Sequence, residues 1–314
     1  MARAGTARGG VVLVLSEEEV RRLLDVDELI DALADAFAEV SAGRTSVPPR
    51  IAAVVPERGL LAAMPGYAAG VLETKLVSVF PGTEPSHEAL IALFDAKTGT
   101  PLALMDGTYV TAIRTAAASA LSTRLLARQD ARVLAVLGSG VQARSHLDAV
   151  TRVREFHSVR VAGRSRERAE ALGMDVAESF EAAVRDADVV CACTDASSPV
   201  LRRSWLASGT HVTSVGASQH GPELDDATVR AGVLAVEARV AFEPYPAGAH
   251  ELQGLDPMQA VELGELVAGT RPGRRSAEEI TVYKSMGHAV EDAAAARLVY
   301  EAALREGAGT EVGL

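Results

Sequence analysis

Three small residues are spaced in a way that could hold a dinucleotide. Gly138, Gly140 and Ala143 stand in the stretch VLGSGVQARSH, where an apolar run ends and a helical pattern begins. In a Rossmann turn the first glycine allows a tight bend, the second lets the backbone approach a pyrophosphate, and the third small residue allows close helix packing. The first N–H groups of the helix then bind the phosphates. An ordinary strand-to-helix turn can carry the same residues, so the motif needs support from its surroundings.

Arg164, Ser165 and Arg166 follow the next predicted strand, in VAGRSRER. A dinucleotide site for NAD commonly has an acidic residue at this point, which accepts hydrogen bonds from the ribose hydroxyls. This chain has none there, and two guanidinium groups with a hydroxyl can instead bind a 2′-phosphate. The alternative is that the arginines only begin the next helix in solvent. The sequence predicts that NADP(H) is preferred over NAD(H).

Three cationic residues could bind a carboxylate group of a ligand. Arg114 lies near the start of an alanine-rich segment, where a helix dipole would add to its charge. Arg50 ends the stretch VPPR, and Lys75 lies within ETKLVSVF. A guanidinium group matches a carboxylate in a bidentate way. For each arginine the alternative is an ion pair on the surface.

Lys75 is the candidate for proton transfer. The chain has 28 arginines but only three lysines, and this lysine lies in a strand pattern with Val77 and Val79 on its own face. An ammonium group buried there loses hydration, and burial next to other cations lowers its pKa. A lowered pKa suits a group that exchanges a proton with a ligand. The alternative is a lysine that protects an edge strand from pairing.

Several other residues could have a chemical role. Thr194 and Asp195 follow the strand DVVCACT, and ligands bind at the carboxyl ends of parallel strands. His288, in SMGHAV, could titrate near neutrality or could serve only as a structural residue at a helix start. The seven histidines show no ligand spacing such as HxxxH, so no metal site is expected. Cys191 and Cys193, two apart in an apolar strand, are predicted to be core thiols without a disulfide.

The elements that must position these residues fall into two patterns. Residues 16–43 predict one or two helices, with Ser16 as a cap, and residues 47–82 predict short strands broken by proline and glycine. A hairpin and a strong alanine-rich helix are predicted to follow, up to residue 128. From residue 131 strands and helices alternate, which is typical of a parallel sheet with helices on both faces. The C-terminal part predicts a strand, a glycine turn and a long helix.

The composition limits the class of protein. A chain of 314 residues with 48% hydrophobic residues can form two ordinary domains with buried cores. The net charge of −11 disfavours binding to nucleic acid or to an anionic membrane. No apolar run approaches the roughly 20 residues of a membrane span, and the polar N-terminus does not resemble a secretory signal. We therefore expect a cytoplasmic protein.

Six motifs, in order, resemble those of the ornithine cyclodeaminase/mu-crystallin family. They are MPGY, ETKLVSVFPG, LMDGTYVTAIRTAAASALS, LGSGVQARSHL, VGAS followed by ELDD, and KSMGHAVEDAAAARLVYEAA. The resemblance extends from about Leu15 to Ala303. It implies an α/β fold in which a Rossmann-type doubly wound parallel sheet, residues 123–288, is inserted into a discontinuous α+β domain. That domain, residues 1–122 completed by 289–314, would bind substrate and form a homodimer through its sheet.

The resemblance also implies a set of site residues and a chemistry. Members of the family act with NAD(P) on a 2-amino or 2-imino acid. The expected catalytic residues are Lys75, Arg114 and Ser218, and the expected substrate-binding residues are Arg50, Met64, Lys75 and Arg114. The expected cofactor-binding residues are Gly138, Gly140, Val141, Gln142, Ala143, Arg164, Ser165, Arg166, Thr194, Val215, Ser285, Met286 and Gly287. The last three match the segment whose backbone passes the nicotinamide.

Two departures from the family pattern disfavour ornithine as substrate. Ornithine cyclodeaminases have an aspartate where this chain has Ser218, and a hydroxyl group of ordinary pKa cannot replace a carboxylate base. The acidic residue expected two positions before Met64 is also replaced, by Ala62. A carboxylate clamp, a proton donor and NADPH remain. They predict an NADPH-dependent reductase of a small 2-imino carboxylate, which in reverse is an amino-acid dehydrogenase.

Two other functions stay open at this point. One is an ornithine- or lysine-type cyclodeaminase with bound NAD that uses another acid, such as Glu223 or Asp225 in GPELDD. The other is a non-catalytic protein that binds a ligand in the presence of NADPH. The sequence does not specify the side chain of the substrate.

Overall fold

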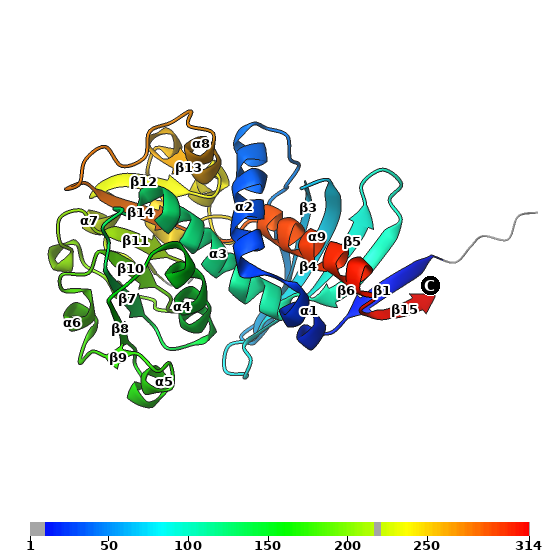
Figure 1. Ribbon diagram of the computed structural model, residues 1–314, viewed down its shortest axis with the longest axis horizontal. Helices are drawn as coiled ribbons and strands as arrows, with labels where there is room; N and C mark the ends of the chain where they lie inside the picture. The colour runs from blue at the N-terminus through cyan, green and yellow to red at the C-terminus, as the bar shows by residue number, and fades with distance from the viewer. Residues whose placement is uncertain (1–9, 217–220, 314) are drawn as a thin grey trace, which may run out of the picture.

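Two β-sheets organise the chain, one in each of two lobes (Figure 1). The structure is a computed structural model, and it describes residues 10–216 and 221–313. Three long helices, α2 (Val26–Ser41), α3 (Thr108–Leu126) and α9 (Ala289–Glu306), lie in and beside the region where the lobes meet. The catalytic prediction for Ser218 falls outside the described residues.

The first lobe contains a seven-stranded sheet in the order β15-β1-β6-β5-β4-β3-β2. Its strands are β1 (Val11–Leu15), β2 (Ile51–Val55), β3 (Gly59–Ala68), β4 (Val71–Val79), β5 (His87–Asp95), β6 (Pro101–Asp106) and β15 (Thr310–Gly313). β1 is parallel to β6, and the other neighbours are antiparallel. The pairing of both ends of the described chain, β1 with β15, was not expected from the sequence.

The two faces of this sheet differ in what covers them. Helix α9 packs on the inner face of β3, β4 and β5, where every second side chain is buried. The outer face carries large exposed apolar side chains, which are Leu61, Tyr67, Leu72, Leu76, Leu90 and Leu104. Cross-strand register places Tyr67 opposite Leu72 and Leu76 opposite Leu90, so these side chains form two apolar pairs on this face.

The second lobe contains an eight-stranded sheet in which all neighbouring strands are parallel. Its strands are β7 (Val133–Leu137), β8 (Ser158–Ala162), β9 (Asp175–Val176), β10 (Val189–Ala192), β11 (His211–Ser214), β12 (Gly232–Val236), β13 (Val261–Glu262) and β14 (Ile280–Lys284). The order is β13-β12-β14-β11-β10-β7-β8-β9, so the direction of winding reverses between β7 and β10. Ligands bind in such sheets outside the carboxyl ends at this reversal. The predicted Rossmann-type fold is confirmed.

The helices of this lobe are mostly short. They are α4 (Val141–Val153), α5 (Arg166–Glu170), α6 (Phe180–Val184), α7 (Asp226–Val229) and α8 (Leu263–Val267), with 3₁₀ turns at Arg203–Trp205, Arg239–Phe242, His250–Leu252 and Pro257–Gln259. The first lobe adds α1 (Glu17–Leu23), whose predicted cap, Ser16, accepts a hydrogen bond from the Glu19 N–H group. Within the described ranges, the helices are too short or too polar to cross a bilayer.

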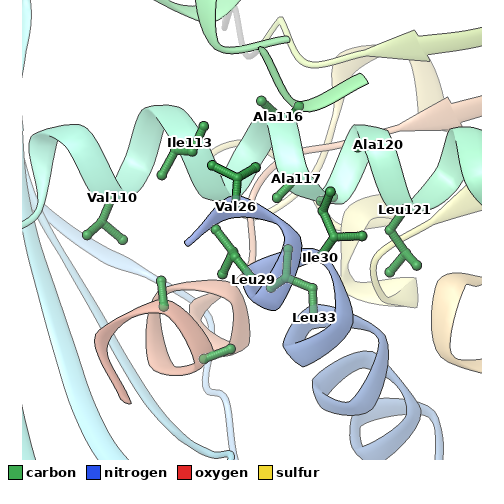
Figure 2. Packing of buried hydrophobic residues seen from close by; sticks show 14 of the residues in the cluster. Val26, Leu29, Ile30, Leu33, Val110, Ile113, Ala116, Ala117, Ala120 and Leu121 are labelled. Carbon is green, nitrogen blue, oxygen red and sulfur yellow. The ribbon is translucent and has the colours of Figure 1, made fainter. Parts of the chain in front are cut away.

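Helix α3 joins the two lobes and forms the centre of the main core. Its residues from Ala112 to Thr123 are all buried, because alanine and other small side chains let helices approach on every side. Figure 2 shows Leu29, Ile30 and Leu33 of α2 facing the apolar side chains of α3. The boundary expected between the substrate domain and the cofactor domain, after residue 122, therefore lies within one continuous helix. Cys191 is also in this core, and neither of the two cysteines forms a disulfide, as predicted.

Candidate active site

The glycine turn after β7 has the geometry of a phosphate-binding turn. Gly138 has φ of +123°, and a Cβ atom there would lie 2.4 Å from the carbonyl oxygen of Cys193. Around Gly140, no described heavy atom lies within 4 Å of the position that a Cβ atom would take. Gly140 also begins α4 without a side-chain cap, so the first N–H groups of the helix are open to a ligand.

Two further features of this turn fit a dinucleotide. Ala143 is completely buried, as the third position of the motif requires for close helix packing. Val141 is exposed at the start of α4, and the buried side-chain oxygen of Gln142 has no hydrogen-bond partner among the described residues. An unpaired buried acceptor beside an open helix start suits a ligand that brings its own donor.

The residues after β8 are exposed at the same edge of the sheet. Ser165 caps α5 and accepts the N–H group of Arg168, which leaves its own hydroxyl proton free to donate. Arg166 pairs with Glu170 one helical turn later. Arg164 is exposed and makes none of the ion pairs recorded for the described residues. The position after β8 thus offers a guanidinium group and a hydroxyl to a phosphate.

Glu223 connects the loops that follow β10 and β11. Its carboxylate accepts the N–H and hydroxyl groups of Thr194, both at 2.7 Å, and the N–H group of Gly216 at 2.8 Å. It also accepts the hydroxyl of Ser214 at 2.7 Å. Asp225 caps α7 through the N–H group of Thr228. Glu223 is thus engaged by backbone and hydroxyl donors, and Asp225 by the backbone N–H groups of Arg203 and Thr228.

Lys284 helps to hold the loop that follows β11. It is completely buried, and its ammonium group donates to Ser214 Oγ at 3.1 Å and to the carbonyl oxygen of Gly216 at 2.5 Å. Glu251 Oε1 lies 3.3 Å away and balances the charge. This lysine is one of the three in the chain, so its rarity was a signal, but the sequence did not show what it contacts.

Glu237 holds the turn after β14. One oxygen of its buried carboxylate accepts three hydrogen bonds of 2.7 Å, from the Ser285 hydroxyl and from the N–H groups of Met286 and Gly287. Gly287 has φ of +74°, and a Cβ atom there would lie 2.6 Å from an Nη atom of Arg114. Glycine is therefore required because the turn lies directly against this guanidinium group.

Arg50 joins the turn from the other side. It donates to the carbonyl oxygens of Met286, at 3.0 Å, and of Gly287, at 2.7 Å. Thus the two arginines predicted to bind substrate meet at the segment predicted to pass the nicotinamide. The sequence predicted each of these residues, and the structure brings them together.

Lys75 and Arg114 are paired with two acids of α9 that the sequence did not single out. Lys75 Nζ lies 3.0 Å from Oδ1 and 2.9 Å from Oδ2 of Asp292. Arg114 contacts Glu291 Oε2 at 2.9 Å and Asp292 Oδ1 at 3.2 Å. All four side chains are buried. Acids in a first helical turn are common, so only the tertiary contact shows their role.

Burial and charge set the proton affinities of this cluster. Burial lowers the pKa of Lys75 to about 8, although Asp292 opposes the shift. Burial raises the pKa of Glu291 to about 7, with Arg114 opposing. Burial alone would also raise the pKa of Asp292, but Lys75 and Arg114 hold it below its ordinary value. Lys75 is therefore a group that can give up or accept a proton near neutral pH.

A small cavity lies beside these groups. Its polar wall is formed by Arg50, Glu237, Gly287 and His288, and its apolar wall by Val47, Pro48, Pro49, Met64, Ala238, Val240, Ala241, Ala247, Met286 and Ala289. Lys75 does not line the cavity, but it lies opposite Met64, a residue of the cavity wall, in the sheet register. His288 begins α9, as predicted, and burial lowers its pKa. The cavity thus combines the guanidinium group of Arg50 and the carboxyl group of Glu237 with an apolar wall.

Comparisons with known proteins agree with this arrangement. The model of the ornithine cyclodeaminase/mu-crystallin family matches residues 11–307. The chain is 41% identical over 310 residues to the ketimine reductase mu-crystallin of Mus musculus. The alignment covers 91% of this chain and 96% of that protein.

Two solved structures are similar over almost the whole chain. One is the Δ1-pyrroline-2-carboxylate reductase of Thermococcus litoralis in complex with NADH and L-proline. It has a TM-score of 0.89 and 36% identity, and the match covers 96% of this chain and 100% of that one. The other is an archaeal alanine dehydrogenase dimer with bound NAD. It has a TM-score of 0.88 and 31% identity, and the match covers 97% of this chain and 99% of that one.

Proposed function

The chain belongs to the ornithine cyclodeaminase/mu-crystallin family, and we propose that within it the protein is an NADPH-dependent reductase of a small 2-imino carboxylate. The named relatives are a ketimine reductase, a Δ1-pyrroline-2-carboxylate reductase and an alanine dehydrogenase. The protein is accordingly an NAD(P)-dependent oxidoreductase that acts on a CH–NH or CH–NH₂ group. In reverse, the same site would oxidise an amino acid.

The observation that carries the proposal is the meeting of Arg50 and Arg114 at the turn Ser285–Gly287, with Lys75 joined to Arg114 through Asp292. Arg50 donates to two carbonyl oxygens of this turn and Arg114 lies against Gly287, so two guanidinium groups are close to the turn, and such groups bind carboxylates well. A 2-imino acid held by its carboxylate in the adjoining cavity would have its C2 atom close to the backbone of the turn. The bound cofactor supplies a hydride to that carbon.

Lys75 is the proposed proton donor to the substrate nitrogen. It is buried, close to the cavity wall, and has a pKa near the range in which the enzyme would work. Asp292 fixes the position of the ammonium group, and Arg114 keeps Asp292 ionised. Proton transfer from a positioned group of this kind contributes about 10²- to 10⁴-fold to a rate. Ser218 is proposed to orient the substrate or a water molecule.

NADP(H) is the proposed cofactor form. Support comes from Arg164 and Ser165, which are exposed or half-exposed after β8, and from the lack of an acidic side chain among residues 163–166. The remaining proposed cofactor contacts come from the loops after β7, β10, β11 and β14, whose carboxyl ends lie at one edge of the parallel sheet. NADPH is available in the cytoplasm, which is the proposed location.

A homodimer through the outer face of the seven-stranded sheet is proposed as the assembly. The face carries the exposed pairs Tyr67–Leu72 and Leu76–Leu90, and monomers rarely expose large apolar patches. The similar archaeal alanine dehydrogenase was solved as a dimer. We also propose that residues 1–122 and 289–314 form the domain for substrate binding and dimerisation, and residues 123–288 the cofactor domain.

A panel of imino acids tests the function. Pyruvate with ammonia, pyruvate with methylamine, and Δ1-piperideine-2-carboxylate are each mixed with NADPH or NADH, and cofactor oxidation is followed by absorbance. We expect oxidation of NADPH by at least one mixture, at a higher kcat/KM than with NADH. Incubation with L-ornithine or L-lysine and catalytic NAD is the matched test of a cyclodeaminase, which would release ammonia without net cofactor turnover. A protein that binds NADPH and turns over none of these substrates would be only a ligand-binding protein.

A further inference from the structure

A buried carboxyl group that the proposed reaction does not use lies beside Lys75. Glu73 precedes Lys75 by two residues in β4, so both side chains point to the inner face of the sheet. Glu73 is only 3% exposed, and neither of its carboxyl oxygens has a hydrogen-bond partner in the described part of the chain. Buried polar groups are nearly always hydrogen-bonded, so an acid with two unpaired oxygens requires an explanation.

The neighbouring strands leave room for this carboxyl group but give it no partner. Glu73 lies opposite Gly66 of β3 and Leu93 of β5 in the sheet register. A Cβ atom on Gly66 would lie 3.2 Å from Oε1 of Glu73 and 3.1 Å from the Cβ atom of Ala289. The glycine therefore makes space for the acid at the point where α9 crosses the sheet. Ala289 is also part of the cavity wall, so Gly66 lies between Glu73 and a residue of that wall.

The charged groups that face Glu73 are already paired with each other. They are Lys75 on its own strand, Arg114 on α3 and Asp292 on α9. Lys75 is held by Asp292, and Arg114 by Asp292 and Glu291. Two cations thus meet two other acids, and Glu73 is a third acid without a cation of its own. A buried carboxylate without a partner is costly, and the group takes up a proton instead.

The proton affinities of Glu73 and Lys75 lie close together. Burial, followed by repulsion from Asp292, raises the pKa of Glu73 to about 9, although Lys75 and Arg114 oppose the shift. Burial lowers the pKa of Lys75 to about 8, with Arg114 and Arg50 acting in the same direction and Asp292 against it. At neutral pH the strand therefore holds a neutral carboxylic acid two residues from an ammonium group.

We propose that Glu73 is a positioning residue that shares a proton with Lys75 and returns one to it after Lys75 has protonated the substrate nitrogen. The inference rests on the proposed reductase function. The Cα atoms of residues two apart in a strand are separated by about 6.5 Å, a distance that long glutamate and lysine side chains span directly or through one water molecule.

The proton and electron balance of the step is complete. The hydride from NADPH forms the C–H bond at C2, and the electron pair of the C=N π bond forms the new N–H bond as an N–H bond of the Lys75 ammonium group breaks. The neutral Lys75 amine then takes the proton of the Glu73 carboxyl group. The resulting Glu73 carboxylate regains a proton from water after the product leaves. Glu73 thus acts through Lys75 and needs no contact with substrate.

An infrared measurement reads the Glu73 proton without any turnover. Wild-type protein, Glu73→Gln and the charge-matched control Glu18→Gln, which changes an exposed acid of α1, are compared at pH 7 with NADPH bound. We expect a carbonyl band of a protonated, weakly hydrogen-bonded carboxyl group that is present in the wild type and Glu18→Gln and lost in Glu73→Gln. Wild-type spectra that lack this band would show an ionised Glu73 and overturn the proposal.

The pH profile of kcat for imine reduction is the second readout. In the wild type the proton on Glu73, whose pKa is about 9, should sustain part of the turnover after Lys75 begins to lose its own proton near its pKa of about 8. Glu73→Gln has no such proton, so its turnover should fall with the loss of the Lys75 proton alone. We therefore expect the alkaline limb to move down by about one pH unit, with kcat at pH 7 within about threefold of the wild type. An unmoved limb, or an equal loss at every pH, would overturn the proposal.

Two further measurements cover the cases in which Glu73→Gln does not fold or no imino acid is reduced. If Glu73→Gln does not fold, the wild-type band alone is followed with pH and must fade over the range in which kcat falls; a band that persists beyond that range refutes the proton sharing. If no imino acid is reduced, the proposed function fails on the activity assay, whereas the infrared band still decides whether Glu73 holds a proton.

Discussion

Replacement of Lys75 by methionine tests the proton donor. Methionine has nearly the same length but no charge, so Lys75→Met removes the ammonium group that lies 2.9 Å from Asp292. Loss of a positioned general acid should lower kcat for imine reduction by about 10²- to 10⁴-fold. The Kd for NADPH should not change, because Lys75 lies on the seven-stranded sheet, away from the glycine turn after β7.

The same change also has a cost in stability that can be separated from catalysis. Both partners are almost completely buried, and breaking a buried ion pair costs about 3–5 kcal/mol because one charge is left unpaired. Arg114 still contacts Asp292 at 3.2 Å, so we expect a loss near the lower end of that range in urea denaturation. In the double variant Lys75→Met, Asp292→Asn the unpaired charge is gone. Its unfolding free energy should recover by about half or more, while kcat stays low.

The assay compares initial rates of NADPH oxidation at saturating imine, with Lys97→Met as the control, since Lys97 lies in the exposed turn between β5 and β6. Each variant is assayed at a temperature at which denaturation curves show it to be folded. If the Lys75→Met variant binds NADPH normally and keeps a kcat within about threefold of the wild type, Lys75 is not the proton donor. The same conclusion follows if the double variant regains activity along with stability.

Three further outcomes are expected. Arg164→Ala should raise the Kd for NADPH by about 10- to 100-fold, the worth of a charge-assisted hydrogen bond, and leave the Kd for NADH nearly unchanged in fluorescence titrations; equal effects on both cofactors would contradict the 2′-phosphate assignment. Burial lowers the pKa of His146 to about 4 and of His211 to about 3, while unfolded histidine titrates near about 6.5. As pH falls below that value, only the unfolded chain takes up these protons, so the unfolding free energy of the wild type should drop by about 4 kcal/mol between pH 7 and 5. In His146→Gln the drop should be about half as large. An equal dependence of the unfolding free energy on pH in both proteins, measured by urea denaturation, would contradict this. The double variant Leu76→Glu, Leu90→Glu should sediment as a monomer where the wild type sediments as a dimer. A double variant that stays dimeric would show that the outer face of the sheet is not the interface.

The fold was predictable where its signals are local. The spacing of Gly138, Gly140 and Ala143, and the alternation of apolar runs with helical patterns, depend on residues within a few positions of each other. The same is true of the Ser16 cap. The strands β1 and β15 were missed because each is a short run of four or five residues whose partner lies at the other end of the chain.

The site was predictable only in part, for the same reason. Lys75 stood out because lysine is rare in this chain, and Arg114 because an alanine-rich helix follows it. Asp292 is more than two hundred residues from Lys75 and looks locally like any acid in a first helical turn. Glu237 follows an apolar strand without any spacing signal, and only the folded structure shows that it holds the turn at Gly287. Glu73 and Lys75 were visible as neighbours on one strand face, but the lack of a partner for Glu73 could not be read from the sequence.

The central claim is that hydride passes from NADPH to C2 of an imino acid in this site. The most direct measurement uses NADPH labelled with deuterium at C4, in each of its two stereochemical forms, together with the imine that gives the highest kcat/KM. Mass spectrometry and NMR of the product then locate the label. We predict one deuterium at C2 of the amino acid from one of the two labelled forms. An amino acid without deuterium at C2 from both forms would contradict the account.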